Sequence, residues 1–286
     1  MKPKVIAIVG PTASGKSALG NFLATKLSGE VIAADSRQVY KGMRVISRAL
    51  PTGRQAIREH MVGVADPRKQ YSAGAYQKAA ERILRYIVVF KKKVPIVVGG
   101  TGFYADALLR VPLPQVAPNA TLRTTLAKKT PMQLLAMLKK LDPKSAARVD
   151  PKNIVRLVRA IEIVKALGKI PAPIYSSPYT TLWLGLPNSK NLTAGVEARL
   201  KAGMVAEAKK LRATLTKKRF SELGFEFDLL ADYIDKKITK QQLVERIANS
   251  ERKYAKRQSK WFKRYKDIHW VKNKTEALKL SKTFLQ

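Results

Sequence analysis

Residues 5–17 read VIAIVGPTASGKS, and this segment constrains the fold more than any other part of the chain. The apolar, β-branched run Val5–Val9 predicts a buried strand, and residues 18–27 are expected to continue as a helix. Between them lies Gly-x-x-x-x-Gly-Lys-Ser, a loop whose backbone N–H groups can turn inward around a phosphate at the helix N-terminus. A strand, this loop and a helix in that order predict a parallel α/β sheet that binds a di- or triphosphate.

The residue types of this phosphate loop (residues 10–17) each suit phosphate binding. Gly10 and Gly15 permit backbone conformations and a close approach that a Cβ would block. Lys16 is expected to reach the outer phosphate oxygens, and the Ser17 hydroxyl to ligate Mg²⁺. The residues expected to surround the phosphates are Gly10, Thr12, Ala13, Ser14, Gly15, Lys16 and Ser17. The motif alone leaves open whether the ligand is a diphosphate or ATP, so a small-molecule kinase or an ATPase remains an alternative.

The charge of the chain points to a polyanionic partner. Lys and Arg number 56 against 20 Asp and Glu, which gives a net charge of +36 spread along the whole chain. Such a field attracts nucleic acid, although a host whose proteins are all basic would explain it without a specific partner. The segment from Glu251 to the end of the chain is especially basic, and its helix is the best local candidate for contact with a phosphate backbone.

Composition excludes several kinds of site. The chain has no Cys and only two His, His60 and His269, so a disulfide, a thiolate site and a His-ligated metal site are excluded. Any metal is expected to be Mg²⁺ on oxygen ligands. The early strand argues against a signal peptide, and no apolar run approaches the roughly 18 residues of a membrane span. We therefore expect a cytoplasmic, monomeric protein with no membrane contact.

The pattern along the chain predicts an α/β core interrupted by a helical insertion. Apolar runs at 31–34, 60–64 and 94–98 alternate with helices, one of them capped by Ser72. Residues 119–168 read as entirely helical between Pro-rich stretches, with a capping box at Thr130 and further helix starts at Asp142-Pro143 and Asp150-Pro151. We predict a core of residues 1–112 and 177–286, and an insertion of residues 113–176.

The second half of the core is expected to contain another strand, two helices and a last strand. The strands are predicted at 181–186 and 268–271, and a single helix is predicted over 192–215. A capping box at Thr239 opens a long helix that is expected to run to about residue 266. One stripe of this helix is apolar and aromatic, and we favour core packing over base stacking as its role.

Three polar clusters fall at the predicted carboxyl ends of strands, where ligands of such sheets bind. They are residues 14–17, residues 35–38 (Asp-Ser-Arg-Gln) and Thr101 with its flanking glycines. The Asp35 carboxylate could hold Mg²⁺ through water or take a proton from a substrate, and it could equally cap a turn. Thr101 could belong to the site or to a simple Gly-rich turn.

These segments and others resemble bacterial tRNA dimethylallyltransferases along nearly the whole chain. The matching stretches are GPTASGKS (10–17), ADSRQVYKGM (34–43), ADPRKQYSAGAY (65–76), VVGGTGFYADALL (97–109), NIVRLVRAIEIVKALGK (153–169) and YAKRQSKWFKR (254–264). The resemblance implies transfer of a dimethylallyl group from dimethylallyl diphosphate to N6 of an adenosine just 3′ of a tRNA anticodon. It further implies that the loop holds the diphosphate leaving group.

The resemblance also implies roles for individual residues. Asp35 would be the general base, with Lys16 and Thr101 as its partners in catalysis and Ser17 as the Mg²⁺ ligand. The flipped-out adenosine and the rest of the tRNA, including the anticodon stem-loop held by the insertion, would be contacted by Asp35, Ser36, Arg37, Gln38, Thr101, Arg123, Arg156, Arg159, Lys253, Lys256, Arg257 and Gln258.

The chain departs from the family pattern near the phosphate site. The family places two Arg residues four apart at the start of the helix near 192, where this chain has Asn191 and Gly195. Glu226 stands where Lys or Arg is usual, and Val155 replaces a Gln. Lys190 or Lys201 could substitute for the lost Arg. The alternatives are a prenyltransferase acting on free adenine nucleotides, a phosphate-loop kinase and a weakened tRNA-binding relative, and we favour a rewired, competent tRNA enzyme.

Overall fold

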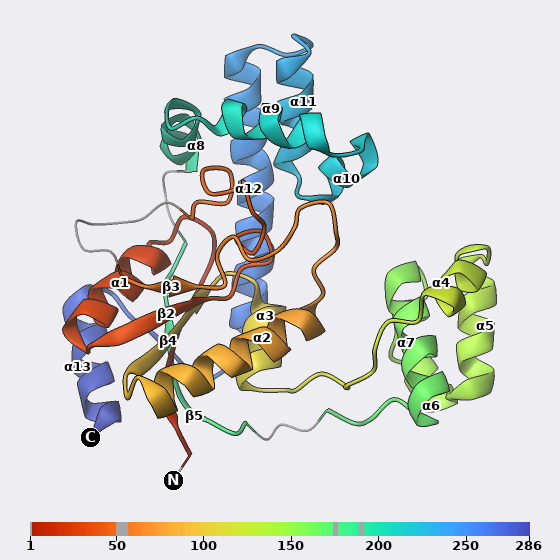
Figure 1. Ribbon diagram of the computed structural model, residues 1–286, viewed down its shortest axis with the longest axis horizontal. Helices are drawn as coiled ribbons and strands as arrows, with labels where there is room; N and C mark the ends of the chain where they lie inside the picture. The colour runs from red at the N-terminus through yellow and green to blue at the C-terminus, as the bar shows by residue number, and fades with distance from the viewer. Residues whose placement is uncertain (1, 50–56, 174–176, 189–191) are drawn as a thin grey trace. The chain divides into compact units, whose positions relative to one another are not determined.

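The computed structural model describes residues 2–49, 57–173, 177–188 and 192–286. By their internal contacts they form two compact units. Unit 1 comprises Met1–Arg110 and Ser176–Gln286, and unit 2 comprises Val111–Tyr175. Figure 1 shows the elements of both units along the chain.

A parallel sheet forms the centre of unit 1, as the sequence predicts. Its described strands lie in the order β3-β2-β4-β1-β5-β6, and every pairing is parallel. They are β1 (Lys4–Val9), β2 (Gly29–Ala33), β3 (Glu59–His60), β4 (Val94–Gly99), β5 (Thr180–Gly185) and β6 (Ile268–Trp270). The strand predicted over 60–64 is therefore shorter and lies at the sheet edge. The phosphate loop leaves β1, an inner strand, at its carboxyl end.

Both faces of this sheet are buried, which explains why its strands read as continuous apolar runs. Val5, Ala7 and Val9 of β1 belong to one hydrophobic cluster, whereas Ile6 and Ile8 belong to another. The helices that contribute to the first cluster include α2 (Ala73–Arg85), α3 (Gly102–Leu109) and α12 (Lys240–Phe262). The second is covered by α1 (Lys16–Lys26) and α13 (Lys274–Leu285). A π-helical turn, η1 (Tyr86–Phe90), extends α2.

Four shorter helices of unit 1 lie near α12 in Figure 1. They are α8 (Leu192–Lys201), α9 (Met204–Thr214), α10 (Lys217–Glu222) and α11 (Glu226–Ile234). The single helix predicted over 192–215 is wrong, because Gly203 adopts a left-handed conformation with φ of 100° and separates α8 from α9. Such a φ suits glycine and stops a right-handed helix. The capping box at Thr239 is confirmed, and α12 ends at Phe262, four residues before the predicted end.

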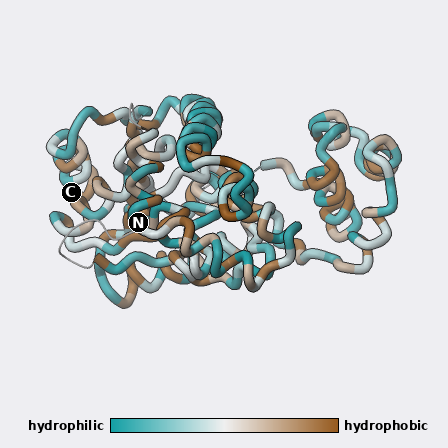
Figure 2. The backbone as a smooth tube through the Cα atoms, turned by 90° about the horizontal axis from the view of Figure 1, so that it is seen from above, coloured by the Kyte–Doolittle hydropathy of each residue, from teal (hydrophilic) through white to brown (hydrophobic). Residues whose placement is uncertain are grey.

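Unit 2 is a small helical bundle with its own core. It contains α4 (Ala120–Ala127), α5 (Pro131–Leu141), α6 (Pro143–Ala146) and α7 (Ile154–Leu167), and its core includes Leu126, Leu134 and Leu157. Figure 2 shows hydrophobic residues in brown alternating with hydrophilic ones in teal along these helices. The capping box of α5 and the Gly168 end of α7 are confirmed.

The helix start predicted at Asp150-Pro151 is wrong. Asp150 instead closes a turn, since its carboxylate accepts a hydrogen bond from Lys152 N at 3.0 Å and its carbonyl accepts one from Asn153 N at 3.1 Å. Asn153 is the residue that caps α7. Among the described residues, none of the helices is long and apolar enough to cross a membrane.

Candidate functional site

The phosphate loop has the backbone geometry that its glycines allow. Gly10 has φ of 144°, Ala13 of 60° and Gly15 of 90°, and Gly15 is the N-cap of α1. A Cβ at Gly10 would lie 2.5 Å from the Leu186 carbonyl oxygen, so no larger residue fits there without a shift. Lys16 Nζ donates to the Pro11 carbonyl at 2.5 Å, which folds its side chain back over the loop. The conformation of the loop thus depends on its own glycines and on the Leu186 backbone beside Gly10.

A buried glutamine from the far end of the chain holds the loop in place. Gln258 on α12 accepts a hydrogen bond from Thr12 N at 2.7 Å through its Oε1 and donates from Nε2 to the Gly100 carbonyl at 2.8 Å. The side chain thus joins the phosphate loop to the Gly-rich turn after β4. Both ends of this amide are thus engaged inside the protein. Contact between Gln258 and tRNA stays a prediction.

Asp35, Ser36 and Thr101 are brought together at the carboxyl ends of β2 and β4. Asp35 Oδ1 accepts from Arg37 N at 2.9 Å and from Gln38 N at 3.3 Å, so the carboxylate does cap a turn. Among the described residues, Asp35 Oδ2 accepts no hydrogen bond and is available to a ligand. Thr101 Oγ1 accepts from Ser36 N at 3.0 Å and lies 3.3 Å from Ser36 Oγ. Thr101 therefore fixes the residue next to Asp35.

A cavity of about 340 Å³ brings the predicted phosphate and base residues into one site. Its walls come from the phosphate loop, the turn after β2, the segment at Ser47 and Arg48, and Gly195 of α8. Burial lowers the pKa of Lys16 from 10.5 to about 8, with the Asp35 charge opposing this shift and the Arg48 charge adding to it. Lys16 thus remains mostly protonated at neutral pH, as an anion-binding lysine must be.

Arg37 is held by a carboxylate and two aromatic rings. Its Nη1 lies 2.5 Å from both oxygens of Glu226, whose side chain is fully buried. The guanidinium lies 5.2 Å from the Phe225 ring centroid and 5.7 Å from that of Tyr254. Although burial opposes it, the charge of Glu226 raises the pKa of Arg37. Glu226, the charge reversal noted in the sequence, therefore positions a predicted tRNA-binding residue.

The apolar and aromatic stripe of α12 has two roles, core packing and contact with Arg37. Leu243, Ile247 and Phe262 are buried in the first hydrophobic cluster, which confirms the prediction of core packing for them. Tyr254 instead packs beside Arg37. Burial raises the pKa of the Tyr254 hydroxyl, and a hydrogen bond with Thr101 partly opposes that rise. The middle of α12 therefore forms part of the site.

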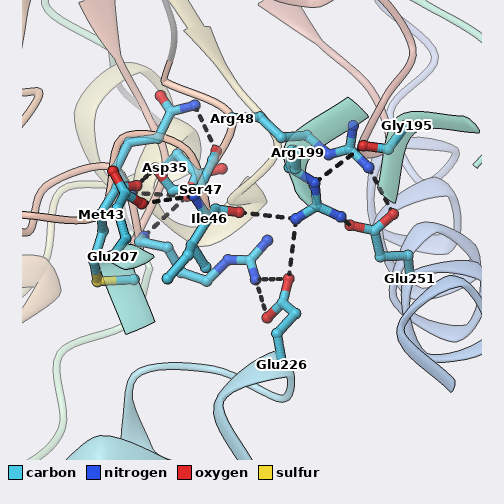
Figure 3. A network of polar contacts seen from close by, with 12 residues as sticks. Asp35, Met43, Ile46, Ser47, Arg48, Gly195, Arg199, Glu207, Glu226 and Glu251 are labelled. Carbon is cyan, nitrogen blue, oxygen red and sulfur yellow. Dashed lines mark hydrogen bonds and ion pairs between the residues drawn. The ribbon is translucent and has the colours of Figure 1, made fainter. Parts of the chain in front are cut away.

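A cluster of arginines that the sequence did not reveal reaches the cavity through Arg48, and Figure 3 shows its polar contacts. Arg48 Nη2 contacts Glu251 Oε2 at 2.7 Å, and Arg199 Nη2 contacts Glu251 Oε1 at 2.5 Å. Arg199 Nη1 also donates to the Ile46 carbonyl at 2.9 Å, and its Nε donates to the Gly195 carbonyl at 3.3 Å. Glu251 is fully buried and balances two guanidinium groups.

Of the two lysines proposed to replace the lost family Arg, Lys201 is not in this cluster. Lys201 lines a separate surface groove with Lys240 and Glu245, and Lys190 and Asn191 lie outside the described residues. The sequence contained a signal for Arg199, because it stands one helical turn after Gly195, the position at which the family pattern has an arginine. Arg48 had none, since nothing in the sequence connects it to residues so far along the chain.

The predicted tRNA-binding residues fall in both units. In unit 2, Arg123 and Arg159 are ion-paired to the buried Glu162, while Arg156 on α7 is exposed. Burial raises the pKa of Glu162, but hydrogen bonds led by that from Arg123 outweigh it and lower the pKa to about 2.

In unit 1, three further predicted residues lie on one exposed part of α12. They are Lys253, Lys256 and Arg257, and the Arg257 guanidinium lies 5.6 Å from the Tyr254 ring centroid. The exposed basic side chains continue along the helix to Lys260 and, just beyond its end, Lys263. This surface fits a phosphate backbone, and contact with tRNA stays a prediction for each of these residues.

Comparison with known proteins finds tRNA dimethylallyltransferases that match most of the chain. The chain is 33% identical to a tRNA dimethylallyltransferase of Pelotomaculum thermopropionicum over 95% of this chain and 91% of the relative. It is 35% identical to a tRNA dimethylallyltransferase of Roseiflexus castenholzii over 92% of this chain and 91% of that relative.

Solved structures agree with these relatives. The full-length tRNA isopentenylpyrophosphate transferase of Bacillus halodurans matches with a TM-score of 0.70 and 29% identity, over 99% of this chain and 96% of the other. A eukaryotic dimethylallyltransferase described as acting on tRNA matches with a TM-score of 0.82 and 28% identity, over 94% and 73%. The family model for IPP transferase matches residues 38–265, and the chain belongs to this family, that of the tRNA dimethylallyltransferases.

Proposed function

We propose that this protein transfers the dimethylallyl group of dimethylallyl diphosphate to N6 of an adenosine in tRNA, just 3′ of the anticodon, and releases diphosphate. The observation that carries the proposal is the single cavity lined by both the phosphate loop and Asp35. A phosphate-binding cation and a carboxylate with a free oxygen are the two groups that such an alkyl transfer needs. Family membership supports the same reaction.

The chemistry follows from the groups on each side of the cavity. The N6 nitrogen forms a bond to the allylic carbon while the bond from that carbon to the diphosphate oxygen breaks. Negative charge grows on the departing diphosphate, and the Lys16 ammonium and the loop N–H groups stabilise it. Asp35 accepts the N6 proton through Oδ2, while its Oδ1 is held by the backbone of the following turn.

The residues of the loop also fit a Mg²⁺ ion. The Ser17 hydroxyl and the Asp35 carboxylate line the same cavity, and the buried Ser14 Oγ has no hydrogen-bond partner among the described residues. These are oxygen ligands of the kind that Mg²⁺ prefers. When bound, the ion would supply further neutralisation of the diphosphate charge.

Binding of tRNA is proposed for the basic surface of α12 and for unit 2. Lys253, Lys256 and Arg257 are exposed and can neutralise phosphates, whereas Arg37, between Phe225 and Tyr254, offers a planar cation beside the cavity. An adenosine must leave the base stack for its N6 to reach a buried electrophile, and aromatic and guanidinium planes suit such a base.

The function is tested by incubation of the protein with labelled dimethylallyl diphosphate, Mg²⁺ and total tRNA, with AMP and ATP as competitors. We expect label in tRNA at an adenosine 3′ of the anticodon, release of diphosphate and no consumption of ATP. Label on AMP or ATP in preference to tRNA would instead indicate a nucleotide prenyltransferase. Stoichiometric ATP hydrolysis on addition of tRNA would indicate a motor or a kinase.

A further inference from the structure

Gly195 and Arg48 share one volume at the wall of the phosphate cavity. A Cβ built on Gly195 would lie 2.8 Å from Arg48 Nη1 and 3.2 Å from Nη2. Real Cβ atoms do not lie this close to another atom, so a larger residue at 195 would require the Arg48 guanidinium, the flexible end of its side chain, to shift. Position 195 is also where the sequence resemblance expects an arginine. The two facts together suggest that a guanidinium is kept at this place and is supplied from another segment.

The Arg48 guanidinium has hydrogen-bonding capacity that the described part of the protein does not use. Its Nη2 is paired with Glu251, while its buried Nε has no hydrogen-bond partner among the described residues. The Arg48 side chain is 23% exposed and lines the cavity together with Lys16. A partly buried guanidinium that lines a cavity can donate N–H groups to an anionic ligand there.

The charge balance around Arg48 supports the same conclusion. Arg37 is paired with Glu226, and Arg199 is paired with Glu251 through its shortest contact. Arg199 also lies 3.9 Å from Glu226 through its Nη1, so the guanidinium groups of Arg37, Arg48 and Arg199 share two buried carboxylates, and the cluster has one positive charge in excess. Buried cations are stable only when an opposite charge compensates them. A diphosphate in the cavity would complete that compensation.

The backbone at Arg48 is fixed in an unusual conformation. Its φ is 61°, in the left-handed region that non-glycine residues rarely adopt. Arg48 N donates to the Val45 carbonyl at 3.2 Å, while Val45 N and Ile46 N donate to the carboxylate of Glu207 on α9 at 2.9 Å. The turn that carries Arg48 is thus anchored from a second helix. Such anchoring presents the guanidinium to the cavity.

We propose that Arg48 binds the diphosphate of the prenyl donor in this protein and takes the place of an arginine on α8, with Gly195 providing the room. Arg48 donates N–H groups to the phosphate oxygens, and it stabilises the charge that they gain as the allylic carbon–oxygen bond breaks. The proposal rests on the proposed function for the identity of the donor, but the anion site itself requires only the cavity.

The test is calorimetric titration of the full chain with inorganic diphosphate in Mg²⁺. We expect Arg48→Ala to weaken binding about 10- to 100-fold, as for loss of a charged hydrogen bond, and Arg48→Lys to lose less. Gly195→Arg alone should not improve binding, because two guanidinium groups would compete for one volume. Arg48→Ala combined with Gly195→Arg should recover most of the lost affinity. Arg212→Ala, which removes an arginine paired to Asp235 outside the cavity, should change nothing.

Two results would overturn the proposal: unchanged diphosphate affinity in folded Arg48→Ala, or tighter binding in Gly195→Arg while Arg48 is present. Thermal melts establish folding, and Gly195→Arg and Arg48→Lys keep the test decisive if Arg48→Ala is unstable. Binding of tRNA separates a local effect from a structural one, since Arg48→Ala should leave tRNA affinity unchanged. Arg48-dependent diphosphate binding without prenyl transfer to tRNA would refute the proposed function and leave this inference intact. If Arg48→Ala transferred the prenyl group to tRNA with an unaltered KM for the donor, the proposed function would stand and this inference would be refuted.

Discussion

The phosphate loop forms one wall of the cavity, and Arg48 of the arginine cluster lines another, but the loop and the cluster are encoded in different ways. The loop comprises eight consecutive residues, 10–17, whose conformation depends on Gly10, Gly15 and the start of α1. The cluster joins side chains from positions 48, 199 and 251, which meet only in the fold. A backbone cradle cannot be moved to another segment, whereas a guanidinium can be supplied by any neighbouring element. This difference explains why one wall keeps its motif while the other has been rebuilt.

The largest effect is expected at Asp35, on the locally encoded wall. Asp35→Ala should lower the rate of prenyl transfer by about 10²–10⁴-fold, the usual range for loss of a general base. Binding of tRNA should stay nearly unchanged, because the exposed basic residues remain. Steady-state transfer and tRNA binding measure the two effects, with Asp235→Ala as a control outside the cavity. A variant that keeps more than about a third of the wild-type rate would remove Asp35 from this role.

A substitution in the arginine cluster should lower the stability of the fold. Glu251→Gln leaves the Arg48 and Arg199 guanidinium groups without their carboxylate, and we expect a loss of about 3–5 kcal/mol in the free energy of unfolding. Urea denaturation followed by circular dichroism measures it. Glu245→Gln, which changes an exposed residue on the same helix, is the matched control. If both variants lose the same small amount, Glu251 does not hold the cluster together.

A smaller effect is expected in the pH dependence of donor binding. Burial sets the pKa of Lys16 to about 8, and a bound diphosphate favours its charged form. Affinity for dimethylallyl diphosphate should therefore be full below pH 8 and should fall above it, by at most about tenfold per pH unit. Titration calorimetry from about pH 7 to about pH 9.5 covers this range.

Two variants test whether Lys16 of the phosphate loop and Arg48 interact across the cavity. Lys16→Arg should remove the pH dependence, because a guanidinium stays charged. Arg48→Ala should move the fall in affinity to higher pH, since the Arg48 charge lowers the pKa of Lys16. A fall at the same pH in wild type and Arg48→Ala would mean that the two cations do not interact across the cavity.

The same contrast separates what the sequence could and could not predict. The parallel sheet, the phosphate loop and the capping boxes at Thr130 and Thr239 depend on residues close in sequence, and the fold confirms them. The break at Gly203 was missed because a glycine inside an apolar pattern can be tolerated in a helix; only its left-handed φ shows the end.

The unpredicted parts of the site depend on contacts between distant positions. The resemblance assigns Gln258 to tRNA contact, and it gives no sign that the Gln258 amide joins Thr12 N to the Gly100 carbonyl. At Gly195 the chain lacks an arginine of the family pattern, and only the position of Arg48 gives that difference a structural reason. Side chains of this kind leave no local pattern, so their roles emerged from the folded arrangement alone.

The account is tested most directly by kcat/KM for dimethylallyl diphosphate in the tRNA transfer reaction, measured for wild type, Arg48→Ala, Gly195→Arg and the double variant. If the guanidinium can come from either segment, Arg48→Ala should lose about tenfold or more, and the double variant should recover most of that loss. The two substitutions would then be strongly coupled. A double variant as slow as Arg48→Ala, or slower, would contradict the claim that one arginine has replaced the other.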